Sequence, residues 1–280
     1  MMRARVVVSV SAFLLALAIP SIGQNTNTED KRENSFAAHT VQSPAQSESG
    51  PVIVVRPDLS DEQMADLYMA RKDYREAATL YKRLSDQEPH NPVYLNKLGI
   101  ALHQQTALGQ ALKYYERAVK VDPHYADAEN NVGTIWYQRQ KYAKAIKAYQ
   151  KAIAMRKDMA VLYSNLGYAY FADKKYEEAI ASFRQALAID PQLFEHGSSR
   201  TGSLLQDRSV SDRGRFYYLL AKSFAEAGNV DRCLLYLRKA KDEGYKSLAD
   251  VKTDPAFASV VKLPALQEIL APKPEDAPQP

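Results

Sequence analysis

The segment Ala160–Pro191 reads AVLYSNLGYAYFADKKYEEAIASFRQALAIDP, and its apolar residues recur at intervals of three and four. This spacing places one apolar stripe on each of two helices. Three marker positions of the segment repeat backwards along the chain at 34-residue steps, and they hold Gly167, Gly133, Gly99 and Ala65; Ala179, Ala145, Ala111 and Ala77; and Phe183, Tyr149, Tyr115 and Tyr81. A single helical hairpin cannot bury such stripes, so the sequence predicts a stack of hairpins.

These positions resemble the tetratricopeptide repeat (TPR) family, whose pattern runs aromatic or Leu, Leu-Gly, Tyr, then Ala, Phe or Tyr, Ala and Pro. Pro191, Pro123 and Pro89 close three of the four copies, and Lys157 stands at this position in the other copy. The resemblance implies an all-α fold, a right-handed α-α superhelix (TPR solenoid) of about five helix-turn-helix repeats with C-terminal capping helices. We expect Gly167 and Ala179 at the crossing of two helices, and Phe183 in the space between one repeat and the next.

The period and the composition together divide the chain. We predict a signal peptide at 1–23, a disordered linker at 24–57, repeats 1–4 at 58–193, an inserted loop at 194–213, a fifth repeat at 214–247, capping helices at 248–272 and a disordered tail at 273–280. The insertion follows from Ala221, which lies 54 residues after Gly167, one period plus 20. Insertions in repeat proteins form loops on one face, which is often the binding face.

Three local signals mark helix ends in this array. Ser60 and Gln63 have the spacing of a capping box at the start of the first repeat. Gly228 can supply a left-handed residue in the turn of the fifth repeat. Asp254 followed by Pro255 predicts the start of a helix with an acidic cap.

The first residues have the layout of a secretory signal peptide. Arg3 and Arg5 precede an apolar run at 6–19, and small residues follow at Ser21 and Gly23. A run of about 14 apolar residues is short of the roughly 20 that span a bilayer, so cleavage is favoured over an uncleaved anchor. We therefore expect cleavage after Gly23 and a periplasmic or secreted protein.

Charge and cysteine content exclude several classes of function. The net charge is +4, and without Arg3 and Arg5 it falls to +2, with 35 basic against 33 acidic residues. This balance gives no basic stripe for nucleic acid. The only cysteine, Cys233, cannot form an internal disulfide and is expected to pack as a small hydrophobe.

The sequence predicts neither an enzyme nor a cofactor or metal site. None of the five histidines has a paired-ligand spacing; they are His39, His90, His103, His124 and His196. His196 precedes Ser198 and Ser199 in the insertion, but no strand-turn-helix elbow surrounds them and a loop holds catalytic geometry poorly.

The resemblance implies instead a concave groove lined by the first helix of each repeat. The candidate peptide-binding residues are Asn96, Lys97, His103, Asn130, Asn131, Tyr137, Asn165, Tyr168 and Phe171. The asparagines resemble a ladder by which some TPR proteins hold the backbone of an extended peptide, since an amide offers a donor and an acceptor together. The alternative is that the asparagines are solvated groove residues and the tyrosines are partly packed. Only Lys97 fits the family's basic clamp for a C-terminal carboxylate, so a chaperone-tail receptor is disfavoured.

The sequence thus predicts an exported, non-catalytic scaffold that binds an extended segment of another protein in its concave groove. The alternative function is a periplasmic chaperone or assembly factor for a secretion or envelope complex. No nucleic acid, and no stable membrane insertion after signal cleavage, is expected.

Overall fold

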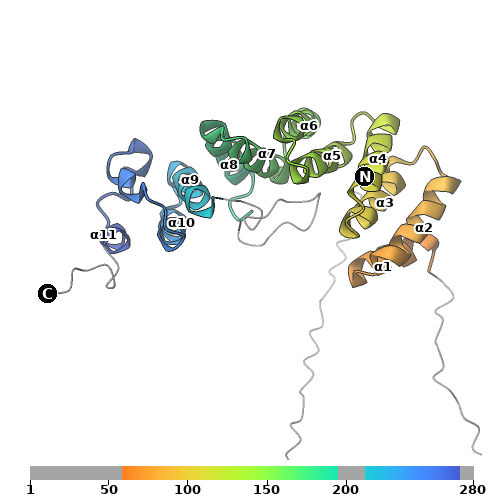
Figure 1. Ribbon diagram of the computed structural model, residues 1–280, viewed down its shortest axis with the longest axis horizontal. Coiled ribbons are helices and arrows are strands. Elements are labelled where there is room, and N and C mark those ends of the chain that lie inside the picture. The colour runs from red at the N-terminus through yellow and green to blue at the C-terminus, as the bar shows by residue number, and fades with distance from the viewer. Residues whose placement is uncertain (1–58, 195–211, 272–280) are drawn as a thin grey trace, which may run out of the picture. The chain divides into compact units, whose positions relative to one another are not determined.

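The computed structural model describes residues 59–194 and 212–271, and every regular element within these ranges is a helix (Figure 1). The elements are α1 (Asp61–Arg71), α2 (Tyr74–Gln87), α3 (Pro92–Gln104), α4 (Leu108–Val121), α5 (Ala126–Gln138), α6 (Tyr142–Met155), α7 (Ala160–Ala172), α8 (Tyr176–Ile189), α9 (Arg213–Glu226), α10 (Val230–Asp242), the 3-10 helices η2 (Leu248–Lys252) and η3 (Pro255–Phe257), and α11 (Pro264–Leu270). The signal peptide, the linker, nearly all of the insertion and the tail predicted from the sequence lie outside the described residues.

The ten longest helices form five consecutive hairpins in the described part of the chain. The pairs are α1–α2, α3–α4, α5–α6, α7–α8 and α9–α10, and the second helix of each pair also packs against the first helix of the next. The C-terminal helices η2 and α11 pack on α10, and η3 packs on α9. The predicted all-α repeat fold is confirmed.

Each central hairpin is closed by a ring that lies over a glycine of its own repeat. A Cβ atom added to Gly167 would lie 2.5 Å from the Phe183 ring, and one added to Gly99 would lie 2.5 Å from Tyr115. The glycine therefore leaves the space that the ring fills. Phe183 was expected between repeats; it packs within its own repeat and also meets Phe216 of the fifth hairpin, with ring centroids 5.8 Å apart.

The turn inside each of the first four hairpins contains a non-glycine residue in the left-handed region. These residues are Lys72, Thr106, Gln140 and Lys174, with φ between 58° and 66°. The fifth hairpin has Gly228 at this place, with φ 76°, as its sequence predicted. A side chain with a Cβ atom is strained in this conformation, whereas glycine is not.

Replacing Lys174 with glycine is therefore expected to raise the free energy of unfolding by about 0.5–1 kcal/mol, because relief of the strain exceeds the entropy that glycine adds to the unfolded chain. Urea denaturation followed by circular dichroism measures the change. The reciprocal variant Gly228→Lys should lose stability. A Lys174→Gly variant less stable than the parent protein would contradict the prediction.

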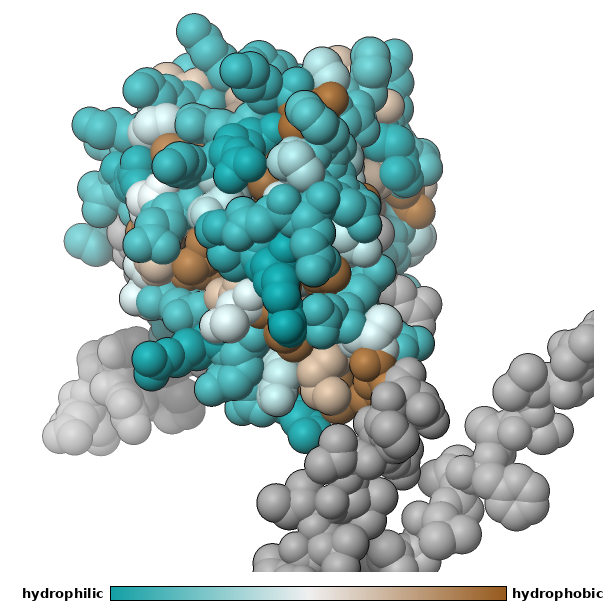
Figure 2. All heavy atoms as spheres, turned by 90° about the vertical axis from the view of Figure 1, so that its right-hand side faces the viewer, coloured by the Kyte–Doolittle hydropathy of each residue, from teal (hydrophilic) through white to brown (hydrophobic). Residues whose placement is uncertain are grey.

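The ends of the array are capped as the sequence indicates. Ser60 Oγ accepts from the Gln63 backbone N–H at 3.2 Å, and Gln63 Oε1 accepts from the Ser60 N–H at 3.0 Å, which confirms the capping box. Asp254 accepts from the Ala256 N–H at the start of η3. The surface seen from the α1–α2 side is mainly hydrophilic, with scattered apolar side chains (Figure 2). A terminal repeat needs such a polar outer face.

Cys233 is fully buried in the fifth hairpin. Burial raises the pKa of its thiol to about 12, so the thiolate does not form near neutral pH. The interpretation of Cys233 as a packed small hydrophobe is confirmed.

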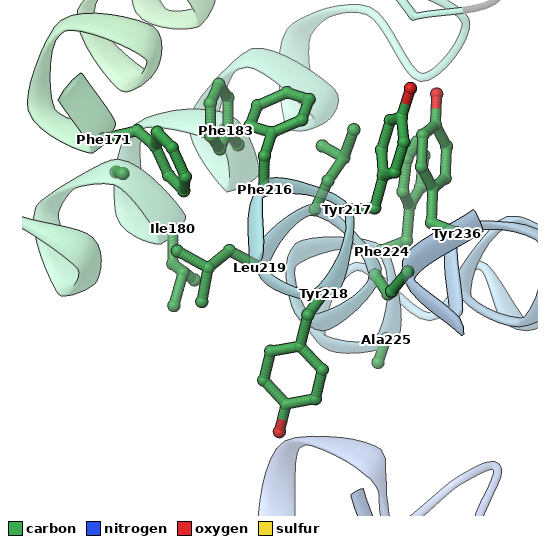
Figure 3. Close-up of a cluster of buried hydrophobic side chains, with 14 of the residues drawn as sticks. Phe171, Ile180, Phe183, Phe216, Tyr217, Tyr218, Leu219, Phe224, Ala225 and Tyr236 are labelled. Carbon is green, nitrogen blue, oxygen red and sulfur yellow. The ribbon is translucent and has the colours of Figure 1, made fainter. Parts of the chain in front are cut away.

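The fifth hairpin packs on the fourth differently from the other pairs. In the regular stack Leu162 clusters with Ala126 and Ala152 of the preceding repeat. Phe216 holds in the fifth repeat the position that Leu162 holds in the fourth, and it lies instead against the ring of Tyr168, with centroids 5.1 Å apart. It also meets the ring of Phe171, with centroids 5.5 Å apart (Figure 3). The 20 extra residues before α9 remove the constraint of a short connection, which permits this different packing. The array therefore continues beyond the insertion through the ring contacts of Phe216 with Tyr168 and Phe171, which we call the aromatic joint.

Candidate functional site

A chain of polar contacts joins the first helices of the first four repeats. Lys97 Nζ donates to Glu62 Oε1 at 3.1 Å. Asn131 Nδ2 donates to Asn96 Oδ1 at 2.9 Å, and Asn165 Nδ2 donates to Asn130 Oδ1 at 2.9 Å. In every step the donor lies 35 residues after the acceptor, one period plus one residue. We call these three contacts the inter-repeat ladder.

The asparagines of the ladder are buried. Asn130, Asn131 and Asn165 are 0% exposed and Asn96 is 4% exposed. The expectation that they line an exposed groove is wrong on this point, because neighbouring first helices approach closely enough for the amides to bond one another. The periodicity assigned these residues to one face but carried no information on how near the next helix lies. Their binding of a peptide stays a prediction.

Several buried polar atoms beside the ladder have no hydrogen-bond partner among the residues that the structure describes. They are Asn130 Nδ2, Asn131 Oδ1, Asp127 Oδ1 and Ser164 Oγ. The first three residues share one face of α5 by their spacing, and Ser164 holds on α7 the register position that Asn130 holds on α5. Burial raises the pKa of the Asp127 carboxyl, although the charge of Arg156 opposes this shift. We call these four side chains the polar strip.

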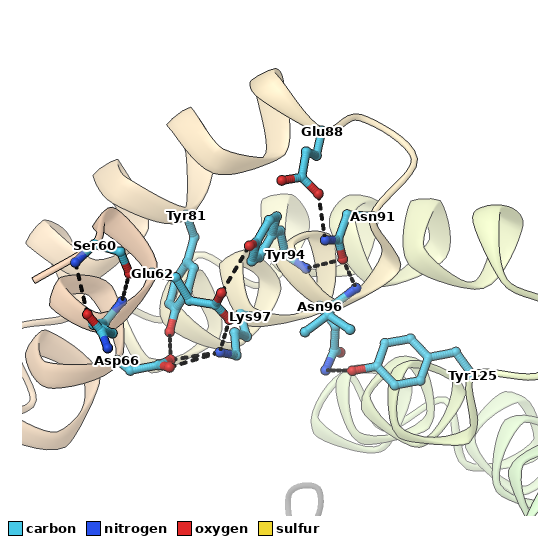
Figure 4. A network of polar contacts seen from close by, with 12 residues as sticks. Ser60, Glu62, Asp66, Tyr81, Glu88, Asn91, Tyr94, Asn96, Lys97 and Tyr125 are labelled. Atoms are coloured by element: carbon cyan, nitrogen blue, oxygen red, sulfur yellow. Dashed lines mark hydrogen bonds and ion pairs between the residues drawn. The ribbon is translucent and has the colours of Figure 1, made fainter.

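A closed network surrounds Lys97 at the first step of the ladder (Figure 4). Its ammonium contacts Glu62 at 3.1 Å and Asp66 at 2.8 Å, while Tyr94 donates to Glu62 at 3.0 Å and Tyr81 donates to Asp66. Burial alone would lower the pKa of Lys97, but the hydrogen bonds with the two carboxylates raise it above its ordinary value. Lys97 is thus already paired with two acids, which removes the remaining candidate for a carboxylate clamp.

The three aromatic residues among the predicted peptide-binding residues lie in the core. Tyr168 stacks on Phe216. Phe171 contacts Phe216 edge-on and Tyr176 in a tilted arrangement. Tyr137 lies 5.5 Å from Tyr142 between ring centroids. All three predicted side chains are buried, so the alternative interpretation of packed aromatic residues is favoured over open pockets.

His103 links the second repeat to the third. Its Nε2 lies 3.0 Å from Gln138 Oε1, and Tyr115 Oη lies 3.5 Å from its Nδ1. Burial lowers the pKa of His103, so the ring favours its neutral form. Within the two described ranges no group of three His, Cys, Asp or Glu side chains is placed to hold a metal ion. His39, His196, Ser198 and Ser199 lie outside these ranges.

Sequence comparison agrees with this geometry. A model described as "Tetratricopeptide repeat" matches residues 160–193, a second of that description matches 63–126, and one described as "TPR repeat" matches 133–174. No curated protein matches the chain. Among solved structures, the crystal structure of MamA is 22% identical over 66% of this chain and 97% of its own, with a TM-score of 0.47. MamA 41-end from Desulfovibrio magneticus RS-1 is 18% identical over 65% of this chain and 92% of its own, with a TM-score of 0.47.

Stacked helical hairpins closed by small and aromatic residues define an α-helical repeat scaffold. Both the residues at the marker positions and the three matching models assign the repeats to one family. The chain is a tetratricopeptide repeat protein, and its class of function is protein–protein interaction. In the ranges 59–194 and 212–271 no helix has both the length and the apolar character needed to cross a membrane.

Proposed function

We propose that this protein is an exported, non-catalytic scaffold that holds an extended segment of another protein along its first helices. The periplasm or the cell exterior is its proposed location, because the first residues have the layout of a signal peptide. Nucleic acid is not a proposed partner, since the charges of the chain nearly balance.

The polar strip supports this proposal most directly. A buried polar atom without a partner costs about 1–3 kcal/mol, and folded proteins keep few such atoms. Asn130 Nδ2 is a donor, Asn131 Oδ1 is an acceptor, and Ser164 Oγ is both. An extended backbone, which alternates N–H and C=O groups, supplies partners for all three. Asn130 and Asn131 therefore each use one amide atom to bind a neighbouring repeat and keep the other for a ligand.

Access to the strip requires a local rearrangement, because Asn130, Asn131 and Ser164 are 0% exposed. Side chains above the strip must move aside before a partner backbone can reach them. Association is therefore expected to be slower than the usual 10⁵–10⁷ M⁻¹s⁻¹ of preformed sites.

The test replaces Ser164 with alanine. The variant keeps the ladder and removes a buried hydroxyl that lacks a partner, so its stability should equal or exceed that of the parent protein. Its affinity for the partner should fall about three- to ten-fold, the effect of one hydrogen bond. The partner is first found by crosslinking in the envelope fraction and mass spectrometry, and its affinity is then measured by calorimetry.

Ser259→Ala is the matched control, because Ser259 is exposed in the C-terminal cap. Equal affinity of the Ser164→Ala variant, the control and the parent would remove the polar strip from the binding site. One stable crosslinked partner supports the scaffold, whereas many unfolded clients would identify a chaperone.

A further inference from the structure

A second candidate site lies away from the ladder, in a cleft between α4, α5 and α6. Its apolar floor is formed by Val119, Val132, Ala148 and Trp136. Its volume of about 340 Å³ is within the range of ligand pockets, about 300–1,000 Å³. We call it the Trp136 cleft. Trp136 is half-buried there and is the only tryptophan of the chain.

The wall of the cleft that α6 supplies is basic. Lys144, Lys147 and Lys151 line it, and α6 contains no acidic residue between Tyr142 and Met155. Lys151 is paired with the buried Glu129 at 3.5 Å. Lys144 and Lys147 make no ion pair with any residue of the described ranges. The cleft is therefore locally basic, although the charges of the whole chain nearly balance.

The indole ring of Trp136 is already covered by cations. Lys144 Nζ lies 4.3 Å from its ring centroid, and the guanidinium of Arg139 lies 5.5 Å from it. The three lysines and Arg139 exceed the two acids at the cleft, Glu116 and Glu129, by two charges. A cationic ligand would meet this excess positive charge, so the cleft selects an anionic one.

The spacing of the lysines suits an extended ligand. Lys144, Lys147 and Lys151 follow one another along the helix axis at about 4.5 and 6 Å, from the rise of 1.5 Å per residue. Side chains on one side of an extended peptide repeat at about 6.8 Å. The flexible side chains of Lys144 and Lys147 can reach two carboxylates at alternate positions, while Lys151 stays paired with Glu129 and the intervening apolar residues face the floor.

We propose that the Trp136 cleft binds an acidic peptide segment of a partner protein, in which apolar residues alternate with Asp or Glu. The site is separate from the polar strip, so a scaffold with both surfaces holds two segments at once. Its recognition is electrostatic and weakens as salt screens the lysines.

Trp136 reports on this site directly. The full chain is titrated with the capped heptapeptide Ser-Glu-Leu-Glu-Leu-Glu-Ser while the emission of Trp136 is followed. We expect a saturable change at low salt that weakens at high salt. The same peptide with Gln in place of Glu should produce no saturable change.

The variant Lys144→Glu/Lys147→Glu should bind the acidic peptide at least ten-fold more weakly and should gain binding of Ser-Lys-Leu-Lys-Leu-Lys-Ser. Both lysines are exposed, so the fold should persist. The control Lys246→Glu/Lys252→Glu makes the same charge change at exposed sites of the C-terminal cap and should leave the titration unaltered. Equal affinity of both variants, no response to the acidic peptide, or binding of phosphatidylserine vesicles in its place would overturn the proposal.

Discussion

Replacing Phe216 with alanine is expected to lower the free energy of unfolding by about 3–5 kcal/mol, the usual cost of emptying a buried aromatic site. Phe216 is fully buried and contacts Tyr168, Phe171 and Phe183, all in the fourth repeat. The cavity would therefore form at the aromatic joint between the fourth and fifth hairpins. The stability of a repeat array is a sum of nearest-neighbour terms. Weakening this joint should therefore let the first four hairpins and the fifth hairpin unfold separately.

Calorimetry should show two separated transitions in the Phe216→Ala variant where the parent protein shows one. Phe216→Leu is the control, since it keeps an apolar side chain in the site and should lose less stability. A loss below 1 kcal/mol in the alanine variant, with a single transition, would show that the joint does not couple the two parts.

The double substitution Asn131→Ala/Asn165→Ala is expected to cost about 2–6 kcal/mol of stability. Each change leaves a buried amide oxygen, of Asn96 or Asn130, without its donor, at about 1–3 kcal/mol apiece. This result differs from what exposed groove residues would give, because surface substitutions usually change stability by less than 0.5 kcal/mol. Urea denaturation of the double variant and the two single variants measures the effect.

A second pair of variants tests whether the cost comes from the orphaned partner. Asn165→Leu leaves Asn130 unpaired, whereas Asn130→Leu/Asn165→Leu removes both ends of the bond and should be the more stable of the two variants. Equal stability of the two would show that the hydrogen bond between Asn130 and Asn165 contributes little.

The sequence predicted the fold because its signals are local and repeated. The spacing of Gly167, Ala179 and Phe183 sets helix faces, and the capping box at Ser60 sets a helix start; both depend on residues near one another in the chain. The packing of Phe216 depends instead on where α9 packs after the inserted residues. The 34-residue period does not determine that position.

The candidate site was predicted less well for the same reason. The period brought Asn96, Asn130, Asn131 and Asn165 to equivalent places, but their burial depends on the distance between helices. The pairing of Lys97 with Glu62 and Asp66 could have been anticipated, since Glu62 lies 35 residues before Lys97. The Trp136 cleft had no such signal, because its floor and wall come from three helices.

The inter-repeat ladder also bears on how such an array could lengthen by gene duplication. Repeat three, residues 126–159, carries both an acceptor and a donor in Asn130 and Asn131. A tandem copy of it would present one Asn131 to another Asn130, so the new junction would be joined by the same kind of amide bond. A tandem copy of residues 92–125 would instead set Lys97 against Asn96, with no carboxylate to accept its charge. Of these two repeats, the third is thus the one by which this array can grow without a mismatched junction.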